Sequence, residues 1–227
     1  MSLPESQTCV EPATDCPIER LGIRRAPFYQ RTGKRVLDIV GATLGLLFLA
    51  PLLVLVALAI KATSQGPIFF RQMRVGKNGR CFPLVKFRSM VHIADSKAPS
   101  ITVRGDPRVT RLGAWLRRYK IDELPQLWNV LNGDMSLVGP RPEVEQYVKC
   151  YSTEEREVLR ERPGITDPAS LAYRHEEAIL SQHPDPEGYY RSRVLHDKLT
   201  LNLSYIDTIS LRTDLRLILD TIRSLFT

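Results

Sequence analysis

The sequence predicts an α+β protein that is mostly helical and carries only a little sheet. Three observations lead to this class: an unbroken apolar run over Val36–Ile60, a tight-turn signal at Asn78-Gly79 between two strand-like stretches, and helix-like stretches over most of the remaining chain. We therefore expect a flexible lead-in over residues 1–29, an apolar helix over residues 30–62 and a compact domain over residues 63–227.

The composition points to a largely water-soluble chain with an acidic partner. Its 227 residues suffice for one core of ordinary size or two small domains, and its hydrophobic fraction of 43% is ordinary for a globular protein. The formal net charge of +7 favours nucleic acid, anionic lipid or a phosphorylated substrate, with a generally basic surface as the alternative. Nucleic acid is not expected, because no reading helix or aromatic stacking platform is evident.

The four cysteines, Cys9, Cys16, Cys81 and Cys150, are scattered along the chain. They form no Cys-x-x-Cys pair, and no histidine stands at ligand spacing from them. The pattern therefore supports neither a zinc site nor a disulfide framework, and reduced thiols in the cytosol are the simpler expectation.

The apolar run Val36–Ile60 is long enough to cross a bilayer. A straight helix of this length reaches about 38 Å at ~1.5 Å per residue, which exceeds the roughly 30 Å hydrocarbon core. A buried helix of a soluble core is the alternative. Basic residues flank both ends: Arg24, Arg25, Arg31, Lys34 and Arg35 precede the run, and Lys61, Arg71, Arg74 and Lys77 follow it. Because a spanning helix normally leaves Lys and Arg on one side, this symmetry favours two cytoplasmic ends.

Pro51 lies near the middle of the apolar run. Its ring clashes with the preceding turn and leaves the carbonyl of Leu47 without its helical donor, so we expect a kink there. A kinked, re-entrant helix that enters and leaves the membrane on one face fits both the proline and the basic flanks. A single crossing is the alternative.

The residues after this run predict one hairpin and several helices. Ile68–Phe70 and Phe82–Phe87 are strand-like on either side of the Asn-Gly turn. Helices are expected over Met90–Lys97, Thr110–Tyr119, Leu124–Leu131, Thr153–Glu161 and Tyr205–Phe226. The last of these is amphipathic, and the second mixes Trp115 and Tyr119 with cationic residues, as in helices that lie in the lipid headgroup layer. An ordinary packed surface helix is the alternative for the second.

Two adjacent carboxylates, Asp122 and Glu123, directly precede Leu124-Pro125. Proline favours the first helical turn, so the pair is expected at a helix N-terminus, where free N–H groups and the helix dipole favour anions. The pair could also hold Mg²⁺ beside a diphosphate, since this ion prefers oxygen ligands. Simple helix capping is the alternative.

Arg141 stands between Pro140 and Pro142. The two prolines stiffen the backbone and fix the direction of the guanidinium, which makes Arg141 a good phosphate ligand. A salt bridge that stabilises a turn is the alternative.

Several motifs follow one another in a fixed order. They are Lys34–Asp38 (KRVLD), Gly66–Gly76 (GPIFFRQMRVG), Lys86–Met90 (KFRSM), Asp106–Arg111 (DPRVTR), Asp122–Leu127 (DELPQL), Gly139–Glu143 (GPRPE), Arg162–Ser170 (RPGITDPAS), and a closing set with Asp197–Leu199, Tyr205, Asp214 and Thr221. From about Tyr29 to the C-terminus, the chain resembles the bacterial sugar transferases, the small monotopic polyprenyl-phosphate phosphoglycosyl transferases.

This resemblance implies an enzyme that transfers a hexose 1-phosphate from a UDP-sugar to undecaprenyl phosphate and releases UMP. The step would begin surface polysaccharide or glycoconjugate synthesis at the bacterial inner membrane, with the catalytic domain (residues 63–227) on the cytoplasmic face, surrounded by interfacial amphipathic helices. Membrane lipids are further expected partners. The sugar, the pathway and the oligomeric state, a homodimer included, stay open. A catalytically inactive, membrane-tethered scaffold of the same fold is the alternative function.

The family motifs also imply roles for individual residues. Asp122 would be the nucleophile that forms an aspartyl–phosphosugar intermediate, and Glu123 would handle protons or position Mg²⁺, the implied cofactor. The residues implied for substrate and phosphate binding are Lys86, Arg88, Asp106, Arg111 and Arg141. Sugar specificity is expected from Tyr173–Leu195, which includes Glu176, Glu177 and Arg191.

The chain departs from the family at the membrane kink. The family usually has Ser-Pro there, where the hydroxyl can bond the freed carbonyl. Here Ala50 precedes Pro51, so this hydroxyl is missing.

Overall fold

The computed structural model describes residues 28–91, 101–103 and 105–226. The expected lead-in therefore lies almost wholly outside the described residues, as does most of the expected helix Met90–Lys97. Met90 itself pairs with Val109 in an isolated antiparallel β-bridge, so no helix begins at this residue.

The apolar run forms a single helix, α1 (Lys34–Thr63), which follows a π-helical turn over Tyr29–Gly33. By length and composition α1 could cross a membrane. Only 11% of its most apolar 18-residue stretch is buried inside the protein. Its exposed large side chains are Val36, Ile39, Val40, Leu44, Leu47, Phe48, Val54, Leu55 and Leu58. The core helix of a soluble protein would bury such residues, so this alternative does not fit α1.

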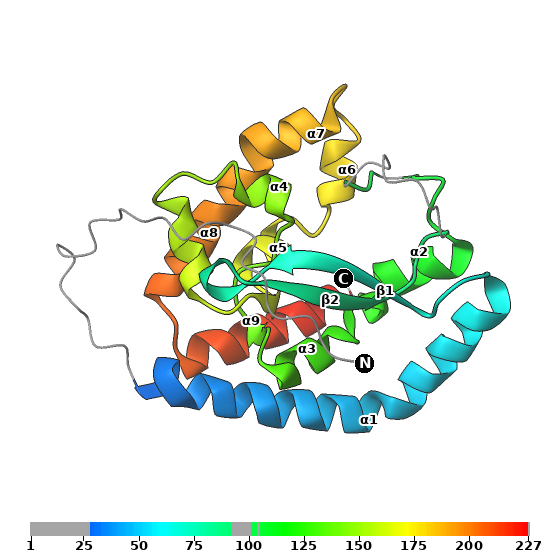
Figure 1. Cartoon of the computed structure of the whole chain (residues 1–227), viewed down its shortest axis with the longest axis horizontal. Helices are drawn as coiled ribbons and strands as arrows, with labels where there is room; N and C mark the ends of the chain where they lie inside the picture. Colours follow the sequence, from blue (N-terminus) through cyan, green and yellow to red (C-terminus); the bar gives the residue numbers. More distant parts are fainter. Residues whose placement is uncertain (1–27, 92–100, 104, 227) are drawn as a thin grey trace.

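Pro51 lies inside α1. In Figure 1 the helix runs along the lower edge of the molecule, and its C-terminal part then turns up toward the strands. A proline within a helix removes one hydrogen bond and crowds the preceding turn, which accounts for a change of direction.

The predicted hairpin is confirmed. Strands β1 (Phe69–Val75) and β2 (Cys81–Phe87) pair antiparallel, with Phe69 opposite Phe87. Asn78 and Gly79 have φ values of 55° and 76°, the left-handed conformation that an Asn-Gly turn adopts readily. The first strand is longer than predicted, because pairing with β2 extends it from Phe70 to Val75.

One expectation about the cysteines is wrong. Cys81 in β2 is disulfide-bonded, whereas Cys150 is a free, exposed thiol. Spacing along the chain does not reveal which distant cysteines approach one another in the fold, so the expectation of reduced thiols fails for Cys81.

Two further predicted helices are confirmed. Helix α2 (Arg111–Arg118) begins after Thr110, whose hydroxyl accepts a hydrogen bond from the backbone N–H of Gly113. A 3₁₀ turn over Ile121–Glu123 leads into α3 (Gln126–Asn132), which ends at Gly133 with φ 91°.

A second, parallel strand pair was not predicted. It joins β3 (Ser136–Val138) to β4 (Gly164–Thr166). The other short elements are α4 (Glu145–Val148), a 3₁₀ helix (Glu155–Arg160) where an α-helix over Thr153–Glu161 was expected, α5 (Pro168–Ala172), α6 (Glu176–Leu180), α7 (Pro186–Tyr189) and a π-helical turn (Tyr190–Val194).

The expected single helix over Tyr205–Phe226 is wrong. The structure has α8 (Leu195–Asp207) and α9 (Leu211–Ser224), separated at Ser210. Ser210 is extended (φ −156°, ψ 160°), and its hydroxyl accepts a hydrogen bond from the N–H of Thr213, which starts a new helix. The amphipathic character of α9 is as predicted. Its exposed apolar side chains are Leu211, Leu215, Leu219 and Ile222, and Phe226 just after the helix is also exposed.

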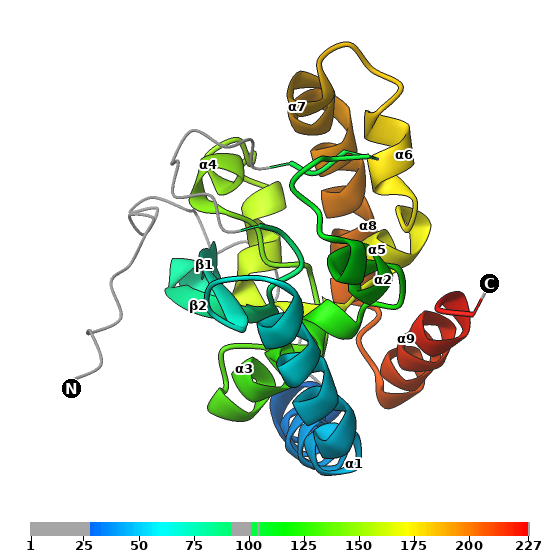
Figure 2. The same ribbon diagram turned by 90° about the vertical axis from the view of Figure 1, so that its right-hand side faces the viewer.

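The core lies above α1. In Figure 2, α1 occupies the lower edge of the molecule and α3 and α9 lie above it. The largest buried cluster joins Val75 of β1 to α4 and α8, and a second cluster packs Ala42 of α1 against Leu127 and Val130 of α3. Helix α1 therefore contacts the domain along one side and exposes its other side.

Buried and half-buried polar side chains tie the N-terminal end of α1 to the domain. Arg35 donates to the carbonyl oxygens of Val130 and Leu131 at 2.6 and 2.9 Å. Asp38 accepts from the Ser136 hydroxyl at 2.9 Å and from the backbone N–H of Leu137 at 2.8 Å. These contacts fix how the helix lies on α3 and β3.

Asp214 of α9 is the centre of a second group of such contacts. Its carboxylate is fully buried and accepts from Lys34 at 2.5 Å, and from the hydroxyls of Tyr29 and Tyr205, each at 2.6 Å. Lys34 also donates to the Tyr205 hydroxyl at 3.0 Å. The start of α1 is thus joined to α8 and α9 through one buried ion pair.

We expect Asp214→Asn to lower the free energy of unfolding by about 3 kcal/mol, because it leaves the buried Lys34 without its counter-charge. Chemical unfolding of the detergent-solubilised protein measures this loss. Asp220→Asn is the matched control: Asp220 pairs only loosely with Arg216 and Arg223 at the surface, at 3.6 and 3.5 Å, so it should cost at most about 1 kcal/mol. Equal losses in the two variants would contradict the central role of Asp214.

Candidate active site

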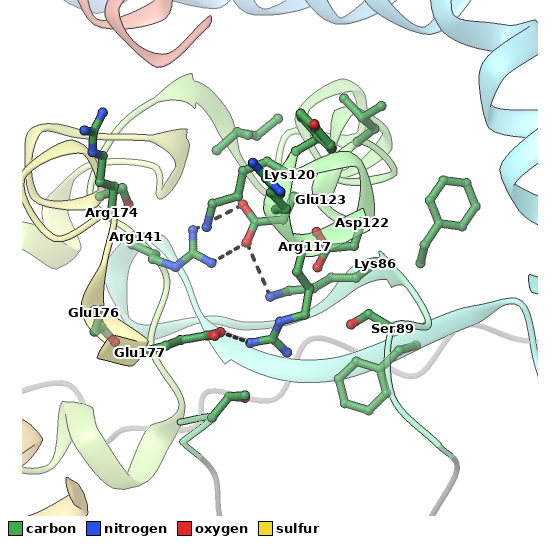
Figure 3. A pocket seen from close by; sticks show the side chains of 18 of the residues that line it. Lys86, Ser89, Arg117, Lys120, Asp122, Glu123, Arg141, Arg174, Glu176 and Glu177 are labelled. Carbon is green, nitrogen blue, oxygen red and sulfur yellow. Dashed lines mark hydrogen bonds and ion pairs between the residues drawn. The ribbon is translucent and has the colours of Figure 1, made fainter. Parts of the chain in front are cut away.

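An open groove crosses the domain, and part of α1 also lines it. Its lining comes from the hairpin, α2, the 3₁₀ turn before α3, the segment after β3, and α6. Figure 3 shows Lys86, Asp122, Glu123 and Arg141 pointing toward one another inside it. Residues from three separate parts of the sequence, Lys86, the adjacent pair Asp122 and Glu123, and Arg141, therefore form one charged cluster.

A sharp turn brings Asp122 and Glu123 into the groove. Lys120 adopts the left-handed conformation (φ 55°) directly after α2, and the backbone N–H of Glu123 donates to its carbonyl at 3.1 Å. The pair thus stands before α3, close to the expected helix N-terminus. Pro125 occupies the N-cap of α3 and no side chain caps this helix, so helix capping does not account for the two carboxylates.

Glu123 is buried and held by two cations. Arg141 reaches its two carboxylate oxygens at 2.5 and 3.4 Å, and the Lys86 ammonium lies 3.7 Å away. Burial opposes ionisation of Glu123, but the charges of Arg141, Lys120 and Lys86 outweigh it and hold its pKa well below the usual range. Glu123 is therefore an anion held between Arg141 and Lys86.

Asp122 differs from its neighbour. It is 6% exposed, and its Oδ1 is buried with no hydrogen-bond partner among the described residues. Burial and the adjacent charge of Glu123 raise the pKa of Asp122, although Lys86, Lys120 and Arg117 oppose the shift. A buried, unpaired carboxylate oxygen is costly unless something else uses it, so its position in the groove indicates a reactive or ligand-binding role.

Lys86 lies on β2 and faces this pair. Burial, aided by the charge of Arg141 and opposed by that of Glu123, lowers the pKa of Lys86 to about 8. Its charge therefore changes near neutral pH, unlike that of an ordinary lysine.

Close backbone packing places Arg141. The N–H of Gly139 donates to the Thr166 carbonyl and the N–H of Gly164 to the Pro140 carbonyl, both at 3.0 Å. A Cβ on Gly139 would lie 2.3 Å from the carbonyl oxygen of Arg162, so only glycine fits at this crossing. The segment that carries Arg141 is thereby fixed against β4.

The other sequence-predicted residues lie around the same groove. Arg88 and Arg111 line it, Arg88 buried and Arg111 exposed. Asp106 also lines it, but Arg108 holds its carboxylate at 2.6 Å and lowers its pKa. Asp106 therefore positions Arg108, and its role in substrate binding stays a prediction together with those of Arg88 and Arg111.

Sequence reasoning missed several charged pairs at the groove. Arg117 of α2 pairs with Glu177 of α6, across the groove (Figure 3), and Lys198 of α8 pairs with Glu176 at 2.7 Å. Arg117 belonged to the aromatic and cationic stretch that was assigned to lipid headgroups, a pattern that cannot distinguish an ion pair to a distant helix.

Arg74, one of the basic residues that follow the apolar run in the sequence, has a structural role in the hairpin. It lies inside β1, donates to the Pro142 carbonyl at 2.9 Å and pairs with Glu143 at 3.4 Å. Pairing in the hairpin turns it away from the end of α1 and toward the segment of Arg141.

The expected magnesium ion would find few protein ligands. In the described part of the chain, no three His, Cys, Asp or Glu side chains are grouped to hold a metal ion. Mg²⁺ often takes one or two protein carboxylates and completes its shell with substrate phosphates and water. The unpaired Oδ1 of Asp122 and the carboxylate of Glu123 fit this smaller role.

We expect Gly164→Ala to destabilise the protein by about 1–3 kcal/mol, because the new Cβ would lie 2.1 Å from the backbone nitrogen of Gly139. Thermal unfolding in detergent measures the effect. Gly45→Ala is the control, since its Cβ would meet only the flexible side chain of Leu127, at 3.2 Å. A Gly164→Ala protein as stable as this control would refute the close packing under Arg141.

Known proteins resemble the chain over nearly its whole length. The family model described as bacterial sugar transferase matches residues 29–227. An undecaprenyl-phosphate glucose phosphotransferase of Komagataeibacter xylinus is 42% identical over 92% of this chain, and the match covers 41% of that relative. A UDP-glucose:undecaprenyl-phosphate glucose-1-phosphate transferase of Caulobacter vibrioides is 42% identical over 86% of this chain and 70% of its own length. An exopolysaccharide production protein of Rhizobium leguminosarum is 40% identical over 84% of this chain and 94% of its own.

The chain thus spans less than half of the first of these relatives and nearly all of the third. The matched region includes the 3₁₀ turn of Asp122 and Glu123, the hairpin and the segment of Arg141. On the family match and these identities, the chain belongs to the bacterial sugar transferase family.

Proposed function

We propose that this protein transfers a hexose 1-phosphate from a UDP-sugar to undecaprenyl phosphate and releases UMP, at the start of surface polysaccharide or glycoconjugate synthesis. The names of the two transferases that resemble this chain support these two substrate classes. The observation that carries the proposal is the unpaired Oδ1 of Asp122, buried in a groove beside a Glu123 that two cations hold.

In the first step an oxygen of Asp122 attacks the β-phosphorus of the UDP-sugar. A bond forms between this oxygen and the phosphorus, and the bond from the phosphorus to the bridging oxygen breaks. The electron pair leaves with UMP, and the ionised carboxylate needs no base to remove a proton. The covalent intermediate divides a displacement between two anions into two easier steps.

In the second step an oxygen of undecaprenyl phosphate attacks the same phosphorus. The bond to Asp122 breaks and its carboxylate is regenerated, while the sugar 1-phosphate passes to the lipid phosphate. Asp122 and Glu123 differ in their partners, which suits them to different roles: the unpaired one reacts, and the paired one keeps Arg141 and Lys86 in place.

The cations stabilise the negative charge of both steps. Lys86 and Arg141 already face Glu123, and their remaining N–H groups can bind phosphate oxygens without moving far. Bound beside Asp122 and Glu123, Mg²⁺ would neutralise charge on the diphosphate and make UMP a better leaving group.

We place α1 in the cytoplasmic leaflet of the bacterial inner membrane, entering and leaving on the same side. Three observations support this geometry: apolar side chains are exposed along the helix, Pro51 lies within it, and both its ends contact the same domain, through Lys34 at the start and Ser64 just after the end. The groove then lies at the membrane surface, where a soluble UDP-sugar and a lipid phosphate can meet. Helix α9, with its exposed apolar side chains, would rest in the headgroup layer.

A catalytically inactive scaffold is the alternative, and the complete charged cluster speaks against it. We expect UMP release from at least one member of a panel of UDP-sugars when undecaprenyl phosphate is present. Asp122→Asn should reduce this release at least about a thousandfold, because its amide is a poor nucleophile. Asp207→Asn, at an exposed position of α8 outside the groove, is the control. Substantial release by Asp122→Asn would refute the nucleophile, and no release by the wild type would favour the scaffold.

The pH dependence should follow Lys86. Its pKa of about 8 predicts that the rate falls as the pH rises through this value, because the lysine loses the charge that faces Glu123 and the diphosphate. Lys86→Gln should lack this alkaline loss. The fall in the rate of this variant at acidic pH should move to higher pH, because removing a nearby cation raises the pKa of Asp122 further. Lys149→Gln, at an exposed surface pair, should keep the wild-type profile. If the rate of Lys86→Gln still fell at alkaline pH, the titration of another group would cause that fall.

A further inference from the structure

Arg88 occupies a distinct place in the groove. It follows β2 directly, and its backbone N–H donates to the Ile68 carbonyl at 2.9 Å, so it continues the line of the strand. Side chains two residues apart on a strand point to the same side and lie about 7 Å apart. Arg88 is therefore one step beyond Lys86, toward the end of α1.

Only part of the Arg88 guanidinium has a partner. Its Nη2 donates to the carbonyl and the hydroxyl oxygens of Ser64, at 2.9 and 2.7 Å. Its Nε and Nη1 are buried and have no hydrogen-bond partner among the described residues, although the residue is only 6% exposed. Buried donors without partners are rare in proteins and indicate that something else binds there.

Arg88 also differs from the other cations of the groove. The other buried or half-buried cations among the described lining residues each pair with a carboxylate. They are Arg74, Lys86, Arg108, Arg117, Arg141 and Lys198. Arg88 forms no ion pair with a described carboxylate. No described residue thus compensates its charge, as suits a residue that binds an anion arriving from outside.

The surroundings of Arg88 are apolar on the side of the membrane helix. Ser64, which it holds, directly follows the last residue of α1. Phe69 and Phe70, at the start of β1, are each more than 40% exposed and line the same groove. A ligand that combines a long apolar chain with a terminal phosphate fits this arrangement, with the chain along α1 and the phosphate at Arg88. A UDP-sugar has no apolar part to place there.

We propose that Arg88 binds the phosphate of the lipid acceptor, whereas Lys86 and Arg141 face the diphosphate of the sugar donor. This assignment rests on the proposed function, since it presumes a polyprenyl phosphate as the second substrate. The two phosphates then approach Asp122 from different ends of the groove, the donor from the side of Arg141 and the acceptor from the side of Ser64. The acceptor site then lies next to the end of α1, with Arg88 as its phosphate ligand.

The test separates the two steps in the full-length protein. Exchange of labelled UMP into the UDP-sugar, without lipid, reports the donor step alone. Steady-state transfer to undecaprenyl phosphate gives the KM for the lipid. We expect Arg88→Lys to raise this KM at least about tenfold, because a charged arginine–phosphate contact is lost. UMP exchange should change less than about twofold. Arg88→Gln, which keeps a donor for the Ser64 carbonyl but no charge, should raise the same KM.

Two controls complete the experiment. Arg80→Lys, at an exposed position at the other end of the hairpin, should leave the KM for the lipid unchanged. Ser64→Ala removes the hydroxyl contact to Arg88 but keeps the carbonyl contact, and should change this KM less than about twofold. If Ser64→Ala reproduced the effect of Arg88→Lys, Arg88 would act only by holding the end of α1, and the proposal would fail.

Two other results would overturn the assignment. A loss of UMP exchange as large as the loss of transfer would place Arg88 in the donor site, and an unchanged KM for the lipid in both Arg88 variants would remove it from the acceptor site. Failure of the wild type to exchange UMP with any UDP-sugar is a different result, because it would refute the proposed function itself.

Discussion

The ion pair between Glu123 and Arg141 is the interaction on which the site depends. It joins the 3₁₀ turn after α2 to the segment after β3. In this turn Glu123 is the carboxylate next to Asp122, and Arg141 holds it. Because Glu123 already has Arg141 and Lys86, these cations do not close over the Oδ1 of Asp122, which stays unpaired. The fold thus gives two adjacent carboxylates opposite electrostatic surroundings, and the proposed division of labour between them follows from this difference.

The exposed apolar helix imposes a second constraint. A helix that leaves its large side chains outside the domain must be attached by other means, and the start of α1 is attached through Lys34, Arg35 and Asp38. The chain just after its end is attached through Ser64 and Arg88. Both attachments lead to the same domain, which keeps the groove at a fixed distance from the helix. The proposed reaction between a soluble and a lipid-borne substrate would use this fixed relation between the site and the membrane.

Local signals in the sequence predicted a good part of the fold. The Asn78-Gly79 turn and the helical stretches of α2 and α3 each depend on a few neighbouring residues, so the sequence could indicate them directly. The break at Ser210 escaped notice because apolar residues continue with helical spacing across it, and only the capping geometry separates α8 from α9.

Contacts between distant residues were harder to foresee. The parallel pair β3–β4 consists of strands of three residues each, too short for a recognisable pattern, yet it fixes Arg141. Asp122, Glu123 and Arg141 were predicted as site residues, but their arrangement was not, since Arg141 and Glu123 are 18 residues apart and helical or strand periodicity carries no information about such a pair. The partly unpaired Arg88 likewise emerges only from the packing around Ser64.

The central claim is that Asp122 becomes covalently linked to the phosphosugar. Intact-mass spectrometry of the wild-type protein mixed with a UDP-sugar, in the absence of lipid, tests this claim most directly. The account predicts one added sugar phosphate per chain, mapped by peptide analysis to Asp122 and lost when undecaprenyl phosphate is added. An adduct on another residue, or active transfer in a protein that never carries an adduct, would contradict it.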